Sequence, residues 1–175
     1  GSDLNIVAPE STVTLAAPII VDNGGTIRLD TTNGSLNLAA PLSATDGTIT
    51  ITAGSDITLG KESDISTEGG TISVDAGIDL SMGNGTVIDA GAGAISLTAG
   101  GDMTLGSVRS TNAGNLTIAA NGAITDAGDS SGVDIQAPAG TLVITAASGI
   151  GAGDGLEIHI DTLDLSNTEN GAIAL

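Results

Sequence analysis

The chain has 175 residues, and its 21 acidic residues against 3 basic ones give a formal net charge of −18. It contains no Phe, Tyr, Trp or Cys, which excludes disulfides and thiolate chemistry, and its few Lys and Arg residues argue against nucleic acid as a partner and against membrane insertion. Strong acidity without aromatic residues is typical of disorder, but 40% of the chain is apolar and recurs periodically, so we expect a folded chain.

The chain repeats one eight-residue phrase at intervals of 23 residues, as AGSDITLG (53–60), AGIDLSMG (76–83) and AGGDMTLG (99–106). An earlier match at the same offset joins VTLAAPI (13–19) to LNLAAPL (36–42). Aligned on a glycine, the larger units are GTIRLD (25–30), GTITIT (47–52), GTISVD (70–75), GAISLT (93–98), GNLTIA (114–119) and GTLVIT (140–145). Within each unit, apolar and polar residues alternate over short segments bounded by Gly, Asn or Asp, which predicts strands and turns.

A period of this length indicates a solenoid, because propeller blades need about 40 residues and no helical segment exists for a leucine-rich repeat. We therefore predict an all-β, single-stranded parallel β-helix of about 7–8 coils of 21–26 residues, with about three strands per coil. Coils about 4.8 Å apart give a rod roughly 35 Å long. The predicted interior ladders are Ile27, Ile49, Ile72, Ile95, Leu116 and Leu142; Leu29, Ile51, Val74, Leu97, Ile118 and Ile144; and Ile57, Leu80, Met103 and Ile124.

The opening Gly1-Ser2 is typical of a cloning scar, so we expect residues 3–175 to be a single β-helix segment excised from a longer chain. The end coils of such a segment expose edge strands, which makes end-to-end self-association an expected behaviour.

The phrases AGSDITLG (53–60) and GNLTIAANGAIT (114–125), the richness in Gly, Asn, Thr and Ala, and the lack of Cys resemble the repeat regions of filamentous haemagglutinin-type exoproteins. These are large bacterial surface adhesins and contact-dependent toxins secreted by the two-partner route. The resemblance implies a right-handed β-helix, a secreted or cell-surface location, and a role as an adhesive shaft. It also implies that the parent protein reaches a receptor or glycan on a host or neighbouring cell. It transfers no catalytic residue to this chain.

Asp56, Asp79 and Asp102 occupy one position in three successive coils and are the candidate metal ligands. Like charges stacked about 4.8 Å apart repel by about 0.9 kcal/mol per pair in bulk water. Calcium, which prefers carboxylate oxygens, would relieve this repulsion. Alternatively, backbone N–H groups of the turns bind each carboxylate and no cofactor is present.

Two surface features are candidate binding sites. The first is an outward-facing file of hydroxyl residues, Thr50, Ser73, Ser96 and Thr117. This file either binds a flat ligand such as a crystalline polysaccharide or is an ordinary solvated face of a strand. The segment AGDSSG (127–132) falls in the single 26-residue interval and is expected to form a loop, either a binding loop or a tolerated insertion.

We do not expect an enzyme. Some β-helix proteins cleave carbohydrates, but the three basic residues are scattered and no aromatic residue can stack on a sugar ring. His159 is expected to face outward as a solvated side chain rather than to serve as a general base. The leading hypothesis is a non-catalytic shaft. A glycan- or protein-binding module is the first alternative, and a carbohydrate-active enzyme fragment is the second.

Overall fold

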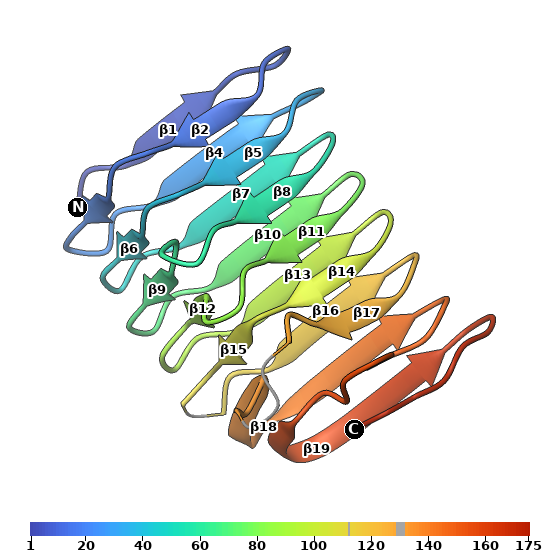
Figure 1. Ribbon diagram of the computed structural model, residues 1–175. Coiled ribbons are helices and arrows are strands. Elements are labelled where there is room, and N and C mark those ends of the chain that lie inside the picture. Colours follow the sequence, from blue (N-terminus) through green and yellow to red (C-terminus); the bar gives the residue numbers. More distant parts are fainter. Residues whose placement is uncertain (112, 129–131) are drawn as a thin grey trace.

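The computed structural model describes residues 1–111, 113–128 and 132–175, and within these ranges the chain is an all-β parallel solenoid without helices. About seven coils stack along one axis, and the two termini lie at opposite ends of the stack (Figure 1). Each complete coil contributes three strands, so three faces run the length of the rod. In the described part of the chain, no helical segment has the length and apolar character that a membrane crossing requires.

Face 1 holds the longest strands of the regular coils, five residues each in five successive coils. Its strands are β1 (Leu4–Val7), β4 (Ile27–Thr31), β7 (Ile49–Ala53), β10 (Ile72–Ala76), β13 (Ile95–Ala99), β16 (Leu116–Ala120), and the second halves of β18 (Ile135–Ala146) and β19 (Ile158–Asn167). The alternation of apolar and polar residues sends one side chain of each pair inward, because successive residues of a strand point to opposite sides.

Face 2 and face 3 are built from strands of three residues. Face 2 contains β2 (Val13–Leu15), β5 (Leu36–Leu38), β8 (Ile57–Leu59), β11 (Leu80–Met82), β14 (Met103–Leu105) and β17 (Ile124–Asp126). Face 3 contains β3 (Ile19–Val21), β6 (Leu42–Ala44), β9 (Ile65–Thr67), β12 (Val87–Asp89), β15 (Ser107–Arg109), and the first halves of β18 and β19. Because β18 and β19 turn the corner between faces, face 3 and face 1 form one 13-stranded sheet.

The interior is a set of aliphatic columns in the predicted register. Ile49 pairs with Ile72, which pairs with Ile95, and the neighbouring column runs through Ile51 and Val74 in the same way. These side chains are at most 1% exposed. The face 2 column joins Ile57, Leu80, Met103 and Ile124. All three ladders predicted from the sequence are confirmed, and Ile and Val suit such pleated columns.

A column of glycines marks the corner that leads into face 1. A Cβ on Gly70 would collide with the carbonyl oxygen of Gly47 one coil below, and the same collision would occur between Gly93 and Gly70. Close approach of the backbones of successive coils, rather than an unusual φ angle, therefore requires glycine here. The periodic glycine on which the sequence units align is thus a packing requirement of the stack.

Candidate functional site

The aspartate column lies at the turn from face 1 to face 2, directly before β8, β11 and β14. Asp56 Oδ1 accepts a hydrogen bond from Asp79 N over 3.3 Å, and Asp79 Oδ1 accepts one from Asp102 N over 2.8 Å. Asp102 Oδ1 accepts the N–H of Ala123 over 2.8 Å. Each carboxylate therefore binds a backbone N–H of the next coil, whereas the sequence suggested an N–H of the same turn.

This arrangement has a simple origin in the parallel ladder. The N–H group of the residue that precedes a strand points back to the previous coil. The regular ladder of backbone hydrogen bonds has not yet begun at this position. The equivalent aspartate of the previous coil therefore supplies its side chain as the acceptor. The same bond recurs on face 3, where Asp64 Oδ1 accepts from Val87 N over 2.9 Å and Asp134 Oδ2 accepts from Glu157 N over 2.9 Å. Charged acceptors make stronger hydrogen bonds than neutral ones.

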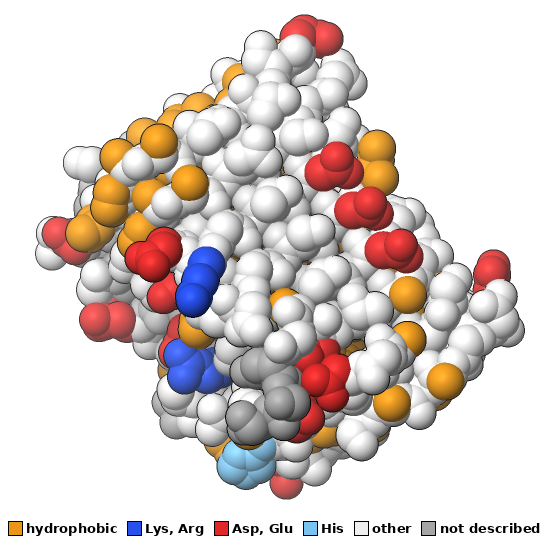
Figure 2. Space-filling view, in the orientation of Figure 1, with side chains coloured by type: hydrophobic (Ala, Val, Ile, Leu, Met, Phe, Trp, Pro, Cys, Tyr) orange, Lys and Arg blue, Asp and Glu red, His pale blue; other side chains and the backbone are white. Residues whose placement is uncertain are grey.

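The aspartate column is also the candidate binding site for a cation. Figure 2 shows a row of acidic side chains along one edge of the stack. Among residues 1–111, 113–128 and 132–175, no group of three or more His, Cys, Asp or Glu side chains is arranged to hold a metal ion. Calcium binding at Asp56, Asp79 and Asp102 stays a prediction, to be decided by experiment.

The hydroxyl file on face 1 is in register, as expected from the repeat. Thr50 lies opposite Ser73, Ser73 opposite Ser96, and Ser96 opposite Thr117. Arg28 precedes the file and Val143 follows it, so the run of hydroxyls spans four coils. Beside it, Thr98 Oγ1 donates to Asp75 Oδ1 over 2.6 Å. The file therefore forms a polar stripe of hydroxyl side chains along face 1.

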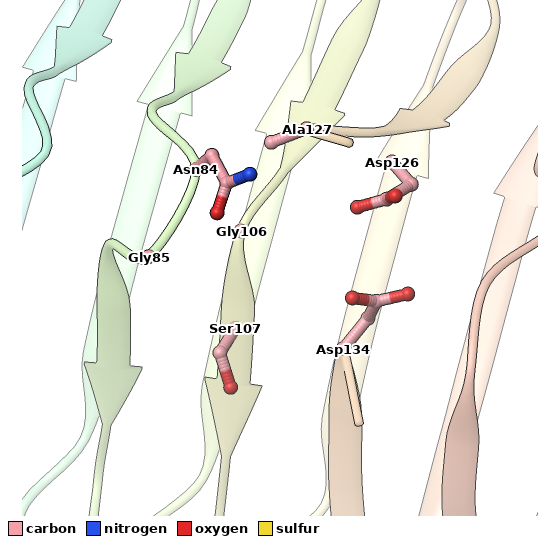
Figure 3. A pocket seen from close by; sticks show the side chains of 7 residues that line it. All are labelled: Asn84, Gly85, Gly106, Ser107, Asp126, Ala127 and Asp134. Carbon is pink, nitrogen blue, oxygen red and sulfur yellow. The ribbon is translucent and has the colours of Figure 1, made fainter. Parts of the chain in front are cut away.

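The 26-residue interval places two acidic side chains around a small cavity. The predicted loop 127–132 lies partly outside the described residues, since 129–131 are not described. Its first residues are anchored, because Ala127 N donates to Leu105 O over 2.7 Å and Asn84 Nδ2 donates to Gly128 O over 3.1 Å. The cavity holds about 30 Å³ and is lined by Asn84, Gly85, Gly106, Ser107, Asp126, Ala127 and Asp134 (Figure 3).

Asp126 and Asp134 point toward one another across this cavity (Figure 3). The side chain of Asp134 is 3% exposed. Burial, together with the charges of Asp126 and Glu157, raises the pKa of Asp134 to about 7, although the N–H of Glu157 opposes the shift. A protonated Asp134 can donate a hydrogen bond, which an ionised carboxylate cannot do.

Sequence reasoning did not identify the Asp126–Asp134 pair. The available signal was the presence of acidic residues on both sides of the interval that breaks the coil period, but periodicity does not show that they line one cavity. His159 lies on β19 beside Gln136 and is exposed, as expected.

Comparisons with protein-family models, with curated proteins and with solved structures found no match to this chain.

Proposed function

We propose that this chain is a non-catalytic shaft or spacer within a secreted bacterial surface adhesin. The observation that carries the proposal is the continuous parallel pairing of face 1, which runs from β1 to β19 without a change of direction. A parallel solenoid has a nearly constant cross-section, so its length grows in proportion to the number of coils. That property is what a spacer requires.

The contacts between and within coils support a role as a stiff rod. Interior columns fill with aliphatic side chains, and buried hydroxyls bond backbone carbonyls at the corners, as in Thr31 Oγ1 to Gly34 O over 2.9 Å and Thr67 Oγ1 to Gly70 O over 2.8 Å. Each coil between the first and the last also hydrogen-bonds to both neighbours along its strands. Such a rod resists bending because every coil is held by the next.

The location rests on the repeat phrases and on the composition. AGSDITLG and its two later copies resemble haemagglutinin-type repeats, and a chain without Cys crosses an oxidising compartment without forming wrong disulfides. A net charge of −18 keeps a surface-exposed rod soluble and discourages lateral aggregation.

A display experiment tests the spacer role. The chain is placed between a cell-surface anchor and a small binding domain, and capture of beads coated with that domain's ligand is measured. A version with one duplicated coil (residues 47–69) and a flexible Gly/Ser linker of equal residue number serve as comparisons. The shaft predicts that capture depends on rod length and that the flexible linker does not reproduce it. Equal capture by rod and linker would contradict the proposal.

The in-register hydroxyl file favours a second candidate, a binding module for a flat glycan surface. Replacement of Thr50, Ser73, Ser96 and Thr117 by Lys removes the hydroxyls and leaves the aliphatic columns intact. A pull-down with insoluble polysaccharides then separates the candidates. A shaft gives no retention with either protein, whereas a binding module gives retention that the substitutions abolish.

A further inference from the structure

The chain contains five asparagines that a glycine follows directly, namely Asn23, Asn33, Asn84, Asn121 and Asn170. An asparagine in this context is chemically labile, because the backbone nitrogen of the next residue can attack the side-chain amide carbon and close a cyclic imide. Glycine carries no Cβ that would obstruct this approach. Since the five positions share one local sequence, the fold determines which of them reacts.

Two of the five glycines have the attacking nitrogen engaged in the stack. Gly24 N donates to Thr45 O over 3.0 Å, and Gly122 N donates to Gly101 O over 2.8 Å. Each of these N–H groups must leave its hydrogen bond before the nitrogen can attack. We therefore expect the imide to form slowly at these two positions.

At two further positions, the peptide groups around the glycine are held by side chains. Gly34 is buried, and its carbonyl oxygen accepts from Thr31 Oγ1 over 2.9 Å. Asn167 Nδ2 donates to Asn170 O over 2.8 Å and to Gly171 O over 3.1 Å. Ring closure rotates the peptide group that joins the asparagine to the glycine, so it has to disturb these contacts.

Asn84 and Gly85 differ from the other pairs because they form an open turn between β11 and β12, and both residues are exposed. Gly85 has a φ of 84°, and within the described residues its N–H donates no hydrogen bond. Among described residues other than its chain neighbours, only Lys61 Cε comes within 4 Å of a Cβ built on Gly85, at 3.9 Å. The attacking nitrogen is therefore unengaged, and water reaches the turn.

The side chain of Asn84 makes one exposed contact, in which Nδ2 donates to Gly128 O over 3.1 Å. Figure 3 shows Asn84 and Gly85 next to one another at the cavity. An exposed hydrogen bond of this kind is weak on balance, because water replaces it. It also holds the leaving group rather than the attacking nitrogen, so it slows ring closure less than the ladder bonds of Gly24 and Gly122 do.

We propose that Asn84 is a site of spontaneous deamidation, which converts it to aspartate or isoaspartate and breaks its bond to Gly128. Gly85 N loses its proton to hydroxide and attacks Cγ of Asn84. The new N–Cγ bond forms, the Cγ–Nδ2 bond breaks, and the nitrogen leaves as ammonia after taking a proton from water. Water then opens the imide at either carbonyl. In sum, amide and water give carboxylic acid and ammonia, with no oxidation or reduction.

The reaction changes the contacts of position 84 in two ways. A carboxylate cannot donate to Gly128 O, so the bond that joins the two segments is lost. The new negative charge also joins Asp126 and Asp134 in the lining of the same cavity, where like charges repel. We therefore expect the aged chain to unfold more easily than the newly made one.

Mass spectrometry of aged samples tests the proposal, because trypsin separates the positions. Cleavage after Lys61 and Arg109 yields fragment 62–109, in which Asn84 is the sole asparagine, and fragment 110–175, which contains Asn121. Folded chain and chain unfolded in urea are incubated at mildly alkaline pH, which favours loss of the N–H proton, and samples are digested at intervals. Tandem mass spectra locate the product within each fragment.

We expect Asn84 of the folded chain to react at least about fivefold faster than Asn121, because the N–H that follows Asn121 must first leave its hydrogen bond. In urea the two rates should become similar, since both dipeptides are then free. Asn84→Gln keeps a side-chain amide, but its longer side chain requires a larger ring, so this variant should gain no product at position 84.

A second pair of variants tests the consequence for stability. Asn84→Asp reproduces the product and is expected to melt at a lower temperature than the unmodified chain. Asn37→Asp is the matched control, because it adds the same charge on face 2, where its ladder neighbours are the uncharged Thr14 and Thr58. Circular dichroism melts measure both variants.

The reaction requires only the fold, so these outcomes are independent of the spacer function that the display experiment tests. The proposal is overturned if Asn84 of the folded chain reacts no faster than Asn121, or if Asn84→Gln gains the product at the same rate. It is also overturned if Asn84→Asp melts at the same temperature as Asn37→Asp.

Discussion

Asp79 Oδ1 accepts the backbone N–H of Asp102 over 2.8 Å, which ties two coils together at the position that the sequence marks as a charge ladder. The carboxylate that repels its neighbours therefore also bonds to one of them. This dual role gives the first prediction. Asp79→Ala loses the acceptor and leaves the Asp102 N–H without it, so we expect the free energy of unfolding to fall by about 1–2 kcal/mol.

Asp79→Asn is the matched control for that change. The amide keeps an oxygen acceptor while removing one charge from the column, so we expect stability equal to or slightly above that of the unmodified chain. Urea denaturation midpoints followed by circular dichroism measure both variants. If Asn proves as damaging as Ala, the charge itself, rather than the hydrogen bond, stabilises the turn.

Thermal melts with calcium and with a chelator test whether the aspartate column binds a metal ion. Because the Oδ1 atoms of Asp56, Asp79 and Asp102 already accept N–H groups, we expect the same melting temperature in both conditions. A rise with calcium that Asp79→Asn removes would establish a metal site at this column.

Two adjacent glycines at this corner are expected to respond differently to alanine in their effect on stability. Gly70→Ala drives a Cβ into the carbonyl of Gly47, whereas a Cβ on Gly69 meets no atom within 4 Å. Overpacking against rigid backbone costs about 1–3 kcal/mol or more, and Gly69→Ala is expected to be neutral or to stabilise by about 0.5 kcal/mol through the unfolded chain. Thermal melts of the two variants measure the difference. Equal effects would show that the coils do not approach each other this closely.

Shortening one side chain in an aliphatic column is expected to lower stability strongly. Leu97 is fully buried between Val74 and Ile118 in its column, so Leu97→Ala leaves a cavity and is expected to cost about 2–5 kcal/mol. Ile78→Ala, at a side chain 49% exposed, should change stability by less than about 0.5 kcal/mol. Denaturation midpoints for both variants check this contrast, and a mild effect at Leu97 would mean that the interior is loosely packed.

Stability near the cavity should depend on pH through Asp134. Its pKa is about 7 in the folded chain against 3.8 when unfolded, so folding favours the protonated form. The stabilisation this gives is fully present below about pH 3.8 and is lost as pH rises through about 7. Asp134→Asn, which cannot ionise, should flatten this part of the profile and exceed the unmodified chain in stability at pH 8.

A pH series of denaturation midpoints measures both proteins. The control is Asp64→Asn, since Asp64 makes the equivalent bond to Val87 N on the same face away from the cavity. A slope that persists in Asp134→Asn would assign the pH dependence to other groups.

The repeat period predicted most of this fold, because alternation and a constant spacing together determine which residues stack. The register of Ile49, Ile72 and Ile95 follows from spacing alone, and so does that of the hydroxyl file. The strand of residues 4–7 was missed because LNIV stands before the first glycine-aligned unit and has no upstream copy for comparison.

The features that depend on three-dimensional approach were not predictable in this way. The aspartate column was recognised, but its bond to the following coil appears only when the start of each strand is placed against its neighbour. Asp126 and Asp134 line one cavity although they stand on opposite sides of the interval that breaks the coil period, and no periodicity describes how they come together. The sequence also did not predict that β18 continues through Pro138, where its pairing with β19 shifts register between Ala137 and Thr141.

A distance measurement along the stack tests whether the coils form a rigid rod. Since the chain has no native Cys, Arg28→Cys and Asp164→Cys provide two unique sites for spin labels, and both lie on the outward file of face 1. Six coil steps separate these positions, through Thr50, Ser73, Ser96, Thr117 and Val143. With labelled chains diluted into unlabelled protein, we expect a narrow distance distribution centred at ~29 Å, and we expect that distance to grow by ~4.8 Å when one coil is duplicated. A broad distribution, or a distance that the added coil does not change, would contradict a rigid stack.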